Sequence, residues 1–386
     1  MFLVGWEPSR RLSLPPGTRG ARDGEDLFQE LRQLAESAGA QVLGAAVQRS
    51  PRPDPATLVG KGKLEEIRAL AQGSGAACVV FDNDLSPTQL RNLERALDLK
   101  VVDRMQLILD IFARRARSRE GQLQVELAQL NYLLPRLSGQ GTVLSRLGGG
   151  IGTRGPGEQQ LEFDRRRIRA RIRKLREAIE RVRSERALHR QHRQERRWRT
   201  VALVGYTNAG KSTLFNALTQ ARVEVSSRLF ATLDPTVRAL KLGSDAQILL
   251  SDTVGFIRRL PPHLVASFRA TLEELEDAAL LLHVTDASDP ERERQDAAVE
   301  SLLESIGVAL TPRLRVWNKV DLLQPAERTR LVEGRGAVGV SALTGEGLET
   351  LRRRIAELTS KVAPVLSSQR PAASPLHMAS QGYRNS

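Results

Sequence analysis

The chain of 386 residues is 40% apolar, and its 59 basic and 45 acidic side chains give a net charge of +14. This length and composition exclude a largely disordered chain and predict two or three domains with a sizeable core. The positive charge exceeds what a catalyst of small metabolites needs, and it favours a polyanionic partner. The single cysteine, Cys78, excludes a disulfide framework and a Cys-based zinc site, and its apolar neighbours predict a core residue.

The sequence carries no membrane or export signal that we can identify. No apolar run approaches the roughly 18 residues that a membrane-spanning helix needs. The apolar start, residues 2–6, is too short for a signal-peptide core and is followed by Glu7 and Pro8. Arg10 and Arg11 resemble a twin-arginine signal, but no apolar segment follows them. We therefore expect a cytoplasmic protein with no membrane span.

Residues 1–110 alternate short apolar runs with segments of helical periodicity, which predicts a small α/β domain. The expected elements are strands over 42–47, 77–81 and 99–102 and helices over 25–37, 63–71 and 86–97. Ser86 followed by Pro87 is typical of a helix start. The glycines and lysines of 60–63 resemble a phosphate-binding loop but lack its full spacing, so we favour a helix start there as well.

Residues 111–197 have the pattern of an antiparallel helical hairpin. Two apolar seams at heptad-like spacing are separated by a glycine-rich loop over 139–157. The seam residues are Leu123, Leu127, Leu130, Leu134 and Leu137 in the first helix and Leu161, Ile168, Ile172, Leu175, Ile179 and Val182 in the second. We expect the second helix to run from Glu158 to about Arg193, with the glycine loop at the tip, where it can approach another molecule closely.

The second helix of this hairpin also concentrates the charge. Residues 154–199 contain 17 basic and 7 acidic residues, which is +10 of the chain's +14. A basic run is often only a solvated helix face, but this excess is clustered beside a glycine loop and favours contact with RNA phosphates. His189 and His192 lie in this run three residues apart without a third ligand, which disfavours a metal site.

Residues 198–360 again alternate strands and helices and contain the residues suited to chemistry. The buried-strand run 200–204 leads directly into G-x-x-x-x-G-K-S over 205–212, and a helix is predicted behind it. A loop in this context surrounds phosphates with its backbone N–H groups and with the N-terminus of the helix. We expect Lys211 to reach the β- and γ-phosphates of a nucleotide and the Ser212 hydroxyl to ligate Mg²⁺.

Two later segments select the base and complete the metal site. Asp252 ends a predicted strand and begins D-x-x-G, so its carboxylate suits the Mg²⁺ shell and the Gly255 N–H can sense a γ-phosphate. Asn318 begins N-K-x-D after another strand, and Asp321 can accept two hydrogen bonds that guanine offers and adenine does not. We expect Asn318 to brace the surrounding loops and Lys319 to pack along the base. These motifs predict GTP rather than ATP.

A switch segment lies between the phosphate loop and the D-x-x-G segment. Thr232, in F-A-T-L-D over 230–234, is our candidate for the second Mg²⁺ ligand. Thr236 competes for this role, but its position favours the start of the next strand. Residues 341–343 follow a short apolar run and suit a backbone N–H donor to the guanine oxygen.

Together these motifs resemble the HflX family of translational GTPases, and the resemblance covers residues 1–360. The most family-specific segment is Gly152–Glu158, which stands ahead of Asp164–Arg166. The other matching segments are Gly205–Ser212, Phe230–Asp234, Asp252–Ile257 and Asn318–Asp321. The resemblance implies an α/β protein with a small N-terminal α/β domain, an antiparallel helical hairpin and a Ras-like G domain with a doubly wound, mostly parallel sheet.

The resemblance also divides the chain and implies its partners. It implies an N-terminal domain over 1–110, the hairpin over 111–197 and a G domain over 198–360. The tail over 361–386 is rich in Ser, Pro, Ala and Gln, and this composition predicts disorder. Members of the family bind GTP and GDP with Mg²⁺, and they bind the large ribosomal subunit and its ribosomal RNA. Several of them separate stalled or idle ribosomes into subunits. We expect a monomer that does the same under stress.

The resemblance further assigns roles to individual residues. The residues expected to bind GTP are Gly205, Tyr206, Thr207, Asn208, Ala209, Gly210, Lys211, Ser212, Thr213, Phe230, Ala231, Thr232, Leu233, Asp234, Asp252, Thr253, Val254, Gly255, Asn318, Lys319, Val320, Asp321, Ser341, Ala342 and Leu343. Of these, Lys211, Thr232 and Gly255 are expected to act in catalysis, and Ser212 and Thr232 to bind the metal. The expected ribosome contacts are Gly152, Arg154, Gly155, Gly157, Arg165 and Arg166.

The residue after the D-x-x-G glycine predicts the rate of hydrolysis. Many Ras-like GTPases place a water-orienting glutamine there, whereas this chain has Phe256, whose side chain forms no hydrogen bonds. We therefore expect slow hydrolysis by the protein alone and a partner that completes the site, with His263 as an alternative orienting side chain. Two other functions stay open. One is an RNA-remodelling ATPase or GTPase that acts on ribosomal RNA, or a ribosome-assembly GTPase, and the other is a GTP-dependent binding module for membranes or protein complexes.

Overall fold

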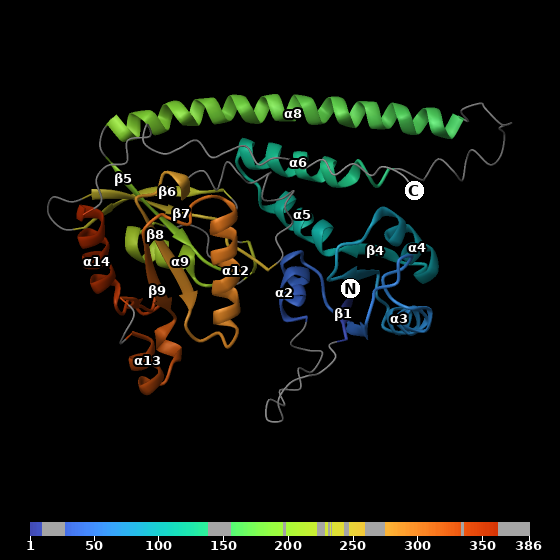
Figure 1. Ribbon diagram of the computed structural model, residues 1–386, viewed down its shortest axis with the longest axis horizontal. Helices are drawn as coiled ribbons and strands as arrows, with labels where there is room; N and C mark the ends of the chain where they lie inside the picture. Colours follow the sequence, from blue (N-terminus) through green and yellow to red (C-terminus); the bar gives the residue numbers. More distant parts are fainter. Residues whose placement is uncertain are drawn as a thin grey trace.

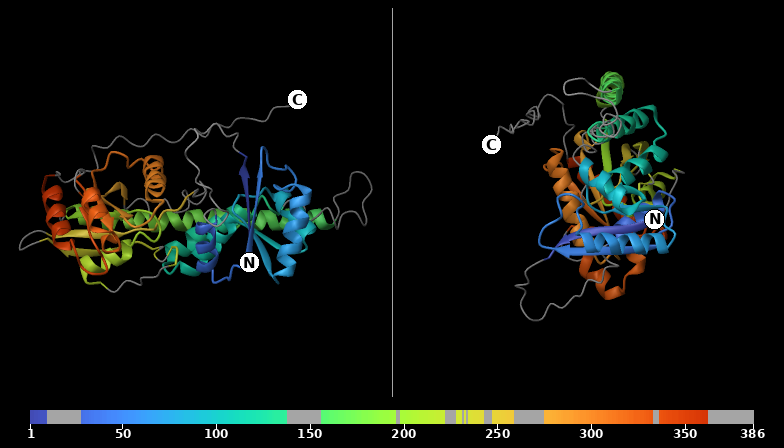
Figure 2. Two further views of the ribbon diagram at one scale, coloured as in Figure 1. Left: turned by 90° about the horizontal axis from the view of Figure 1, so that it is seen from below. Right: turned by 90° about the vertical axis from the view of Figure 1, so that its right-hand side faces the viewer.

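A computed structural model describes residues 1–9, 28–137, 156–195, 198–221, 228–230, 232, 234–242, 247–258, 275–332 and 336–361. In these residues the chain forms two sheets, each covered by helices on both faces (Figure 1). A long helical hairpin lies along one side of both sheets, as the two views of Figure 2 confirm. The α/β fold class expected from the sequence is therefore confirmed.

The N-terminal sheet has four strands in the order β2-β1-β3-β4, and all its strand pairs are parallel. Its elements are β1 (Phe2–Pro8), α2 (Gln29–Ser37), β2 (Gly44–Ser50), α3 (Lys61–Gly73), β3 (Cys78–Phe81), α4 (Pro87–Leu97), β4 (Lys100–Asp103) and α5 (Arg104–Arg115). Side chains alternate between the two faces, since Leu3 packs with α2 and α5 whereas Phe2 and Val4 pack with α3 and α4. Both faces of the sheet are therefore buried.

Most of these elements match the sequence prediction to within a few residues. The helix start predicted at 60–63 is confirmed, because α3 begins at Lys61 after Gly60. Ser86 caps α4 and forms a reciprocal capping box with Gln89. Cys78 is a buried core residue, and burial raises the pKa of its thiol. Strand β1 was not predicted, because a short apolar run at the start of a chain has no alternation or turn signal to mark it as a strand.

The hairpin consists of α6 (Arg119–Leu133) and the 40-residue α8 (Pro156–Glu195), which run antiparallel (Figure 1). At 1.5 Å per residue α8 is about 60 Å long, and it spans the positions of both sheets. Ile172 and Leu175 are its buried seam residues, and Arg171 joins it to Glu126 of α6 at 2.6 and 2.8 Å. Residues 138–155, which include most of the predicted tip loop, and the tail from 362 lie outside the described residues.

The C-terminal sheet has six strands in the order β10-β9-β8-β5-β7-β6, and only the edge pair β6–β7 is antiparallel within the described residues. Its elements are β5 (Arg199–Val204), α9 (Lys211–Thr219), β6 (Thr236–Lys241), β7 (Gln247–Asp252), β8 (Leu280–Asp286), α12 (Arg292–Ser305), β9 (Arg313–Asn318), the 3-10 helix η1 (Val320–Leu322), α13 (Pro325–Val332), β10 (Val338–Gly339) and α14 (Leu348–Lys361). Helices α9 and α14 cover one face and α12 the other, which is the doubly wound arrangement that the resemblance implies.

Three of the predicted chemical motifs lie at the carboxyl ends of strands in this second sheet. The phosphate-loop motif follows β5, D-x-x-G follows β7, and N-K-x-D follows β9. In open α/β sheets ligands bind at this edge, so the topology brings the motifs to one place. None of the helices that the structure describes combines the length and apolarity needed to cross a membrane.

Candidate functional site

The loop between β5 and α9 has a backbone that only glycine permits at two positions. Gly205 and Gly210 have φ angles of +152° and +88°. A Cβ on Gly205 would lie 2.1 Å from the Val284 carbonyl oxygen, and one on Gly210 would lie 2.2 Å from Nδ2 of Asn318. These glycines allow the loop to turn tightly into α9, so the helix N-terminus faces the loop interior and can bind an anion.

Lys211 stands at the start of α9 with its ammonium group folded back onto the loop. Its Nζ donates to the carbonyl oxygens of Gly205 at 3.1 Å and of Tyr206 at 2.7 Å. Burial lowers the pKa of Lys211 to about 8, and the charge of Asp252 opposes this shift. The lysine is therefore desolvated, and a phosphate beside it would stabilise its charged form.

Two hydroxyls and one carboxylate form a cluster next to Lys211. Ser212 Oγ donates to Oδ2 of Asp252 at 2.6 Å, and Thr232 Oγ1 lies 2.8 Å from Ser212 Oγ and 3.2 Å from the same Oδ2. Burial raises the pKa of Asp252, while the Ser212 hydrogen bond lowers it. The alternative candidate, Thr236, begins β6 as its position predicts.

The same cluster tests whether the residues present fit a divalent cation. Oδ1 of Asp252 is buried and has no hydrogen-bond partner among the described residues. Hydroxyl and carboxylate oxygens are the ligands that Mg²⁺ prefers. In the part of the chain that the structure describes, no group of three or more His, Cys, Asp or Glu side chains suits a metal ion. The oxygens of Ser212, Thr232 and Asp252 are of the kind that fits Mg²⁺.

The D-x-x-G segment lies against the phosphate loop. The Thr207 N–H donates to the Phe256 carbonyl at 2.7 Å, and the Phe256 N–H donates to the Gly205 carbonyl at 3.1 Å. A Cβ on Gly255 would lie 2.8 Å from Cγ2 of Thr207 and 3.0 Å from Nζ of Lys211, so only glycine fits there. The Phe256 ring is buried in the core that α12 covers and offers no polar atom to the site.

The base-recognition side of the site is braced by one buried asparagine. Asn318 Nδ2 donates to the Ala209 carbonyl at 2.9 Å, and its Oδ1 accepts the Ala342 N–H at 3.0 Å. Asn318 thus joins the phosphate loop to the loop after β10, as the sequence predicts. Lys319 donates to Asp286 at 2.5 Å.

The remaining residues predicted on this side differ in exposure. Asp321 is exposed on η1, whereas Val320 is buried in a small core under the same turn. Ser341 is fully buried and Leu343 is 83% exposed. An exposed carboxylate on a turn that Val320 anchors in a core suits recognition of a base edge from outside.

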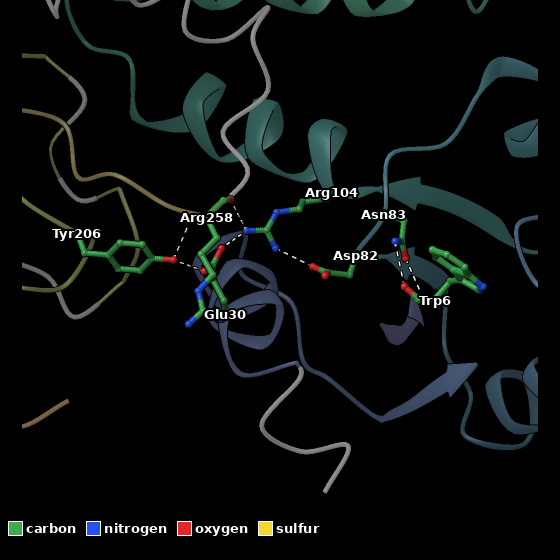
Figure 3. Close-up of polar contacts among 7 residues, drawn as sticks. All are labelled: Trp6, Glu30, Asp82, Asn83, Arg104, Tyr206 and Arg258. Carbon is green, nitrogen blue, oxygen red and sulfur yellow. Dashed lines mark hydrogen bonds and ion pairs between the residues drawn. The ribbon is translucent and has the colours of Figure 1, made fainter. Parts of the chain in front are cut away.

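Several residues expected to bind GTP direct their side chains away from the nucleotide loop. The Tyr206 hydroxyl donates to Glu30 of α2 and accepts the Arg258 N–H at 2.9 Å (Figure 3). Glu30 forms an ion pair with Arg104 of α5, which also contacts Asp82 at 2.7 Å. The second residue of the phosphate loop is therefore bonded to the N-terminal sheet and its helices.

The side chains of three more residues of the predicted GTP-binding set also contact the first half of the chain. Phe230 and Val254 lie in the N-terminal core, and the carboxylate of Asp234 lies at the start of α6. Thr253 donates to the Leu203 carbonyl at 2.5 Å and is buried in its own sheet. The predicted site residues that lie outside the described residues are Ala231, Leu233, Gly152, Arg154, Gly155 and the alternative orienting residue His263.

The partners of these side chains in the first half of the chain were not predicted from the sequence. Glu30, Arg104 and Ser118 contact the switch and phosphate-loop residues or their neighbours, but they belong to no motif. Ser118 has the signature of a helix N-cap, which could have been found from sequence. Nothing in the sequence links that cap to Asp234.

Three family models match the chain in succession, and they agree with this geometry. The GTP-binding GTPase N-terminal model matches residues 25–113, and the GTP-binding GTPase middle-region model matches residues 115–193. The 50S ribosome-binding GTPase model matches residues 200–319. The doubly wound sheet, the glycine loop with Lys211 and Ser212, and the guanine-recognition motif define a P-loop GTPase.

Relatives of similar length assign the chain to a narrower family of GTPases. A GTPase HflX of Caldanaerobacter subterraneus is 49% identical over 343 residues, which are 88% of this chain and 79% of that protein. A GTPase HflX of Escherichia coli K12 is 49% identical over 346 residues, 89% of this chain and 81% of that protein. The chain belongs to the HflX family of GTPases. A GTP-binding protein from Sulfolobus solfataricus, solved with GDP, is 25% identical with a TM-score of 0.47 over 94% of this chain and 100% of that one.

Proposed function

We propose that this GTPase requires Mg²⁺, binds the large ribosomal subunit in the cytoplasm and separates stalled or idle ribosomes into subunits. The observation that carries the proposal is a 40-residue basic helix, α8, whose partner helix α6 also contacts the nucleotide switch. The proposal assigns nucleotide chemistry to residues 198–360, ribosome contact to 111–197 and a supporting role to 1–110. The family-model matches, which change near 114 and 197, support this division.

The metal role in this proposal belongs to Ser212 and Thr232, with Asp252 beside them. When bound, Mg²⁺ would neutralise charge that develops on the β- and γ-phosphates during hydrolysis. Lys211 would hold the same phosphates, and the Gly255 N–H would contact the γ-phosphate from the other side. The hydroxyl cluster and the buried, unpartnered oxygen of Asp252 support this assignment.

The outer face of α8 supports the ribosome contact. Arg167, Arg173, Lys174 and Arg176 are exposed and have no acidic partner among the described residues. Such exposed charges bind RNA phosphates mainly by release of counterions, so binding should weaken steeply as salt rises. The glycines before α8 would let the predicted tip approach RNA backbone where larger side chains would clash.

The absence of a polar side chain at Phe256 supports a role for the ribosome in hydrolysis. The ring is buried in the core that α12 covers and has no hydrogen-bonding atom, so this side chain cannot orient water. We expect GTP turnover by the protein alone to be slow and to rise at least about tenfold with saturating large subunits. Rapid turnover in the absence of ribosomes would contradict this part of the proposal.

The deciding experiment is sucrose-gradient sedimentation of intact ribosomes with the full-length protein and a non-hydrolysable GTP analogue. The protein should convert ribosomes into subunits, and charge reversal of Arg173, Lys174 and Arg176 to Glu should abolish this. A matched control reverses the charges of Arg238 and Lys241 on β6 and of Arg353 on α14. It changes the net charge of the protein by the same amount as the α8 variant. The proposed separation of ribosomes is wrong if the unaltered protein leaves them intact. The proposed role of α8 is wrong if both triple variants split ribosomes as the unaltered protein does, or if both lose the activity equally.

A second variant tests the tip loop predicted from the sequence. Replacing residues 148–157 by a short neutral connector should abolish subunit separation and leave GTP affinity intact, because the phosphate loop is built locally. In contrast, Lys211→Ala should weaken nucleotide binding itself. If the connector variant splits ribosomes at the normal rate, the tip only joins the two helices.

A further inference from the structure

The switch segment carries Thr232 between two contacts with the helices of the first half of the chain. Two residues before it, the Phe230 ring packs edge-on against the Phe112 ring of α5, with 4.5 Å between centroids and 73° between the rings. Phe230 has a φ of +59°, a conformation that bulky residues rarely adopt, and it is buried. The surrounding packing therefore holds Phe230 in a strained conformation.

The second contact lies two residues after Thr232, where the Asp234 carboxylate meets the first turn of α6. Its Oδ2 accepts the backbone N–H groups of Arg117 and Ser118 at 3.0 and 2.7 Å, and its Oδ1 accepts the Ser118 hydroxyl. Ser118 also caps α6, because its Oγ accepts the Gly121 N–H at 2.9 Å. Three donors on one carboxylate at a helix N-terminus make a charge-assisted contact that the helix dipole favours.

The first turn of α6 leaves room for this carboxylate because residue 121 is glycine. A Cβ on Gly121 would lie 2.5 Å from Oδ1 of Asp234 and 3.1 Å from Oγ of Ser118. An alanine there would therefore displace the carboxylate. A Cβ on Gly62, in the first turn of α3, would have nothing within 4 Å, so this residue provides a matched glycine-to-alanine control.

From these contacts we infer that the N-terminus of α6, through Asp234, positions Thr232 in the cluster with Ser212 and Asp252. Two residues of extended chain span about 7 Å, so Thr232 cannot move far while the contacts on both sides hold. Ser118 and Gly121 are thus positioning residues for the metal site, although Ser118 is 116 residues upstream of Asp234. The inference rests on the proposed role of Thr232 as a metal ligand.

The same contacts connect the metal site with the hairpin. Helix α6 is the short arm of the hairpin, and the Glu126–Arg171 ion pair joins it to α8. A shift of α8 along or away from the sheets would therefore act on Asp234 through α6. Helix α6 is thus part of the hairpin and also contacts the switch segment that carries Thr232.

A magnesium titration of GTP hydrolysis by the full-length protein, without ribosomes, tests the inference. We expect Gly121→Ala to raise the Mg²⁺ concentration for half-maximal rate about tenfold, since residues that orient metal ligands typically change metal affinity by roughly 10- to 100-fold. Asp234→Asn should do the same, Ser118→Ala should have a smaller effect, and Gly62→Ala should have none. GDP affinity in excess EDTA should stay within about twofold for Gly121→Ala and Ser118→Ala.

Thr232→Ala separates failure of this inference from failure of the proposed metal site. If Thr232→Ala leaves the Mg²⁺ dependence unchanged, the proposed metal role of Thr232 is wrong. If Thr232→Ala shifts it but Asp234→Asn and Gly121→Ala do not, the metal role stands and the positioning role is wrong. Should Gly121→Ala fail to fold by circular dichroism, the Ser118→Ala and Asp234→Asn results decide. Combining Gly121→Ala with Asp234→Asn should add less than the sum of the single shifts, because both break one contact.

Discussion

The two sides of the nucleotide site are held in different ways. The side that carries the phosphate loop and the base motif is braced inside its own sheet, since Asn318 bonds both to Ala209 and to Ala342. The switch side is held from outside that sheet, by Phe112 on α5 and by Ser118 on α6. Affinity for GTP therefore belongs to the C-terminal sheet, whereas the position of the switch depends on the first half of the chain.

In the proposed function, this difference would let the protein bind nucleotide with one side of the site and respond to the ribosome with the other. The brace that Asn318 provides for the phosphate loop includes no residue of the hairpin. A switch held by α5 and α6 can change when those helices move. Tyr206 stands at the boundary between the two sides, because its backbone forms the phosphate loop while its hydroxyl bonds to Glu30. Variants on each side of the site test whether the two sides are held independently. The variant with the largest expected effect on nucleotide binding comes first.

Asp321→Asn should change base preference most strongly. The variant loses two hydrogen bonds to guanine and leaves polar groups unpaired, so the preference for GTP over xanthosine triphosphate should fall about 10⁴-fold. Competition binding of the two nucleotides to the full-length protein measures this ratio. The exposed Glu327 of α13 offers a control, because Glu327→Gln removes a nearby carboxylate that no motif includes. An unchanged ratio in Asp321→Asn would show that another group recognises guanine.

Asn318→Ala should weaken nucleotide affinity by roughly 10- to 100-fold. It removes both braces and leaves the buried Ala209 carbonyl and Ala342 N–H without their partner, at about 1–3 kcal/mol for each group. Titration with fluorescent GDP gives the affinity, and thermal unfolding shows whether the variant stays folded. A folded variant with normal affinity would mean that the phosphate loop needs no brace from β9.

Raising the pH above about 8 should weaken GTP binding by up to about tenfold per pH unit. The free protein loses the charge of Lys211 as pH passes its pKa of about 8, whereas bound phosphates favour the charged form. Binding must then take up a proton, which calorimetry in buffers of different ionisation enthalpy detects. Lys211→Arg, which keeps its charge, should lose this dependence.

The lowered pKa of Lys211 also affects the stability of the nucleotide-free protein, and here a rise in pH has the opposite effect. In the unfolded chain Lys211 keeps its proton up to its ordinary pKa near 10.5, above the folded value. Between these two values the unfolded state binds more protons, so the free energy of unfolding should rise with pH. Denaturant titrations at about pH 8 and about pH 10, compared with Lys211→Arg, measure this contribution.

Tyr206→Phe should have the smallest effect on nucleotide affinity, below about threefold. The backbone of the phosphate loop stays intact, but Glu30 and the Arg258 N–H lose a partner. The free energy of unfolding should therefore fall by about 1–3 kcal/mol while GTP affinity is kept. A tenfold loss of affinity would instead show that the N-terminal helices contribute to nucleotide binding. The two sides of the site would then not be held independently.

The parts of the fold that sequence predicts well are those with local signals. The capping box at Ser86 and the start of α3 at Lys61 are confirmed because propensity and neighbouring residues decide them. β1 was missed although it is an interior strand, since pairing on both sides, and not local alternation, makes it a strand. The leucine seam of α6 is only half-buried, because the buried apolar positions of this helix, Val125 and Ala128, belong to the N-terminal core.

By itself, the sequence determined the nucleotide chemistry of this protein. The spacing in 205–212, the carboxylate of Asp252 and the N-K-x-D motif define a guanine-nucleotide site, because strands of a parallel sheet bring their carboxyl ends to one edge. Only the tertiary structure decided that Tyr206, Phe230 and Asp234 turn toward the N-terminal half of the chain. Those contacts join residues more than a hundred positions apart, and they depend on how the loops of the C-terminal sheet meet helices α2, α5 and α6. No local pattern in the sequence specifies those contacts between the two halves of the chain.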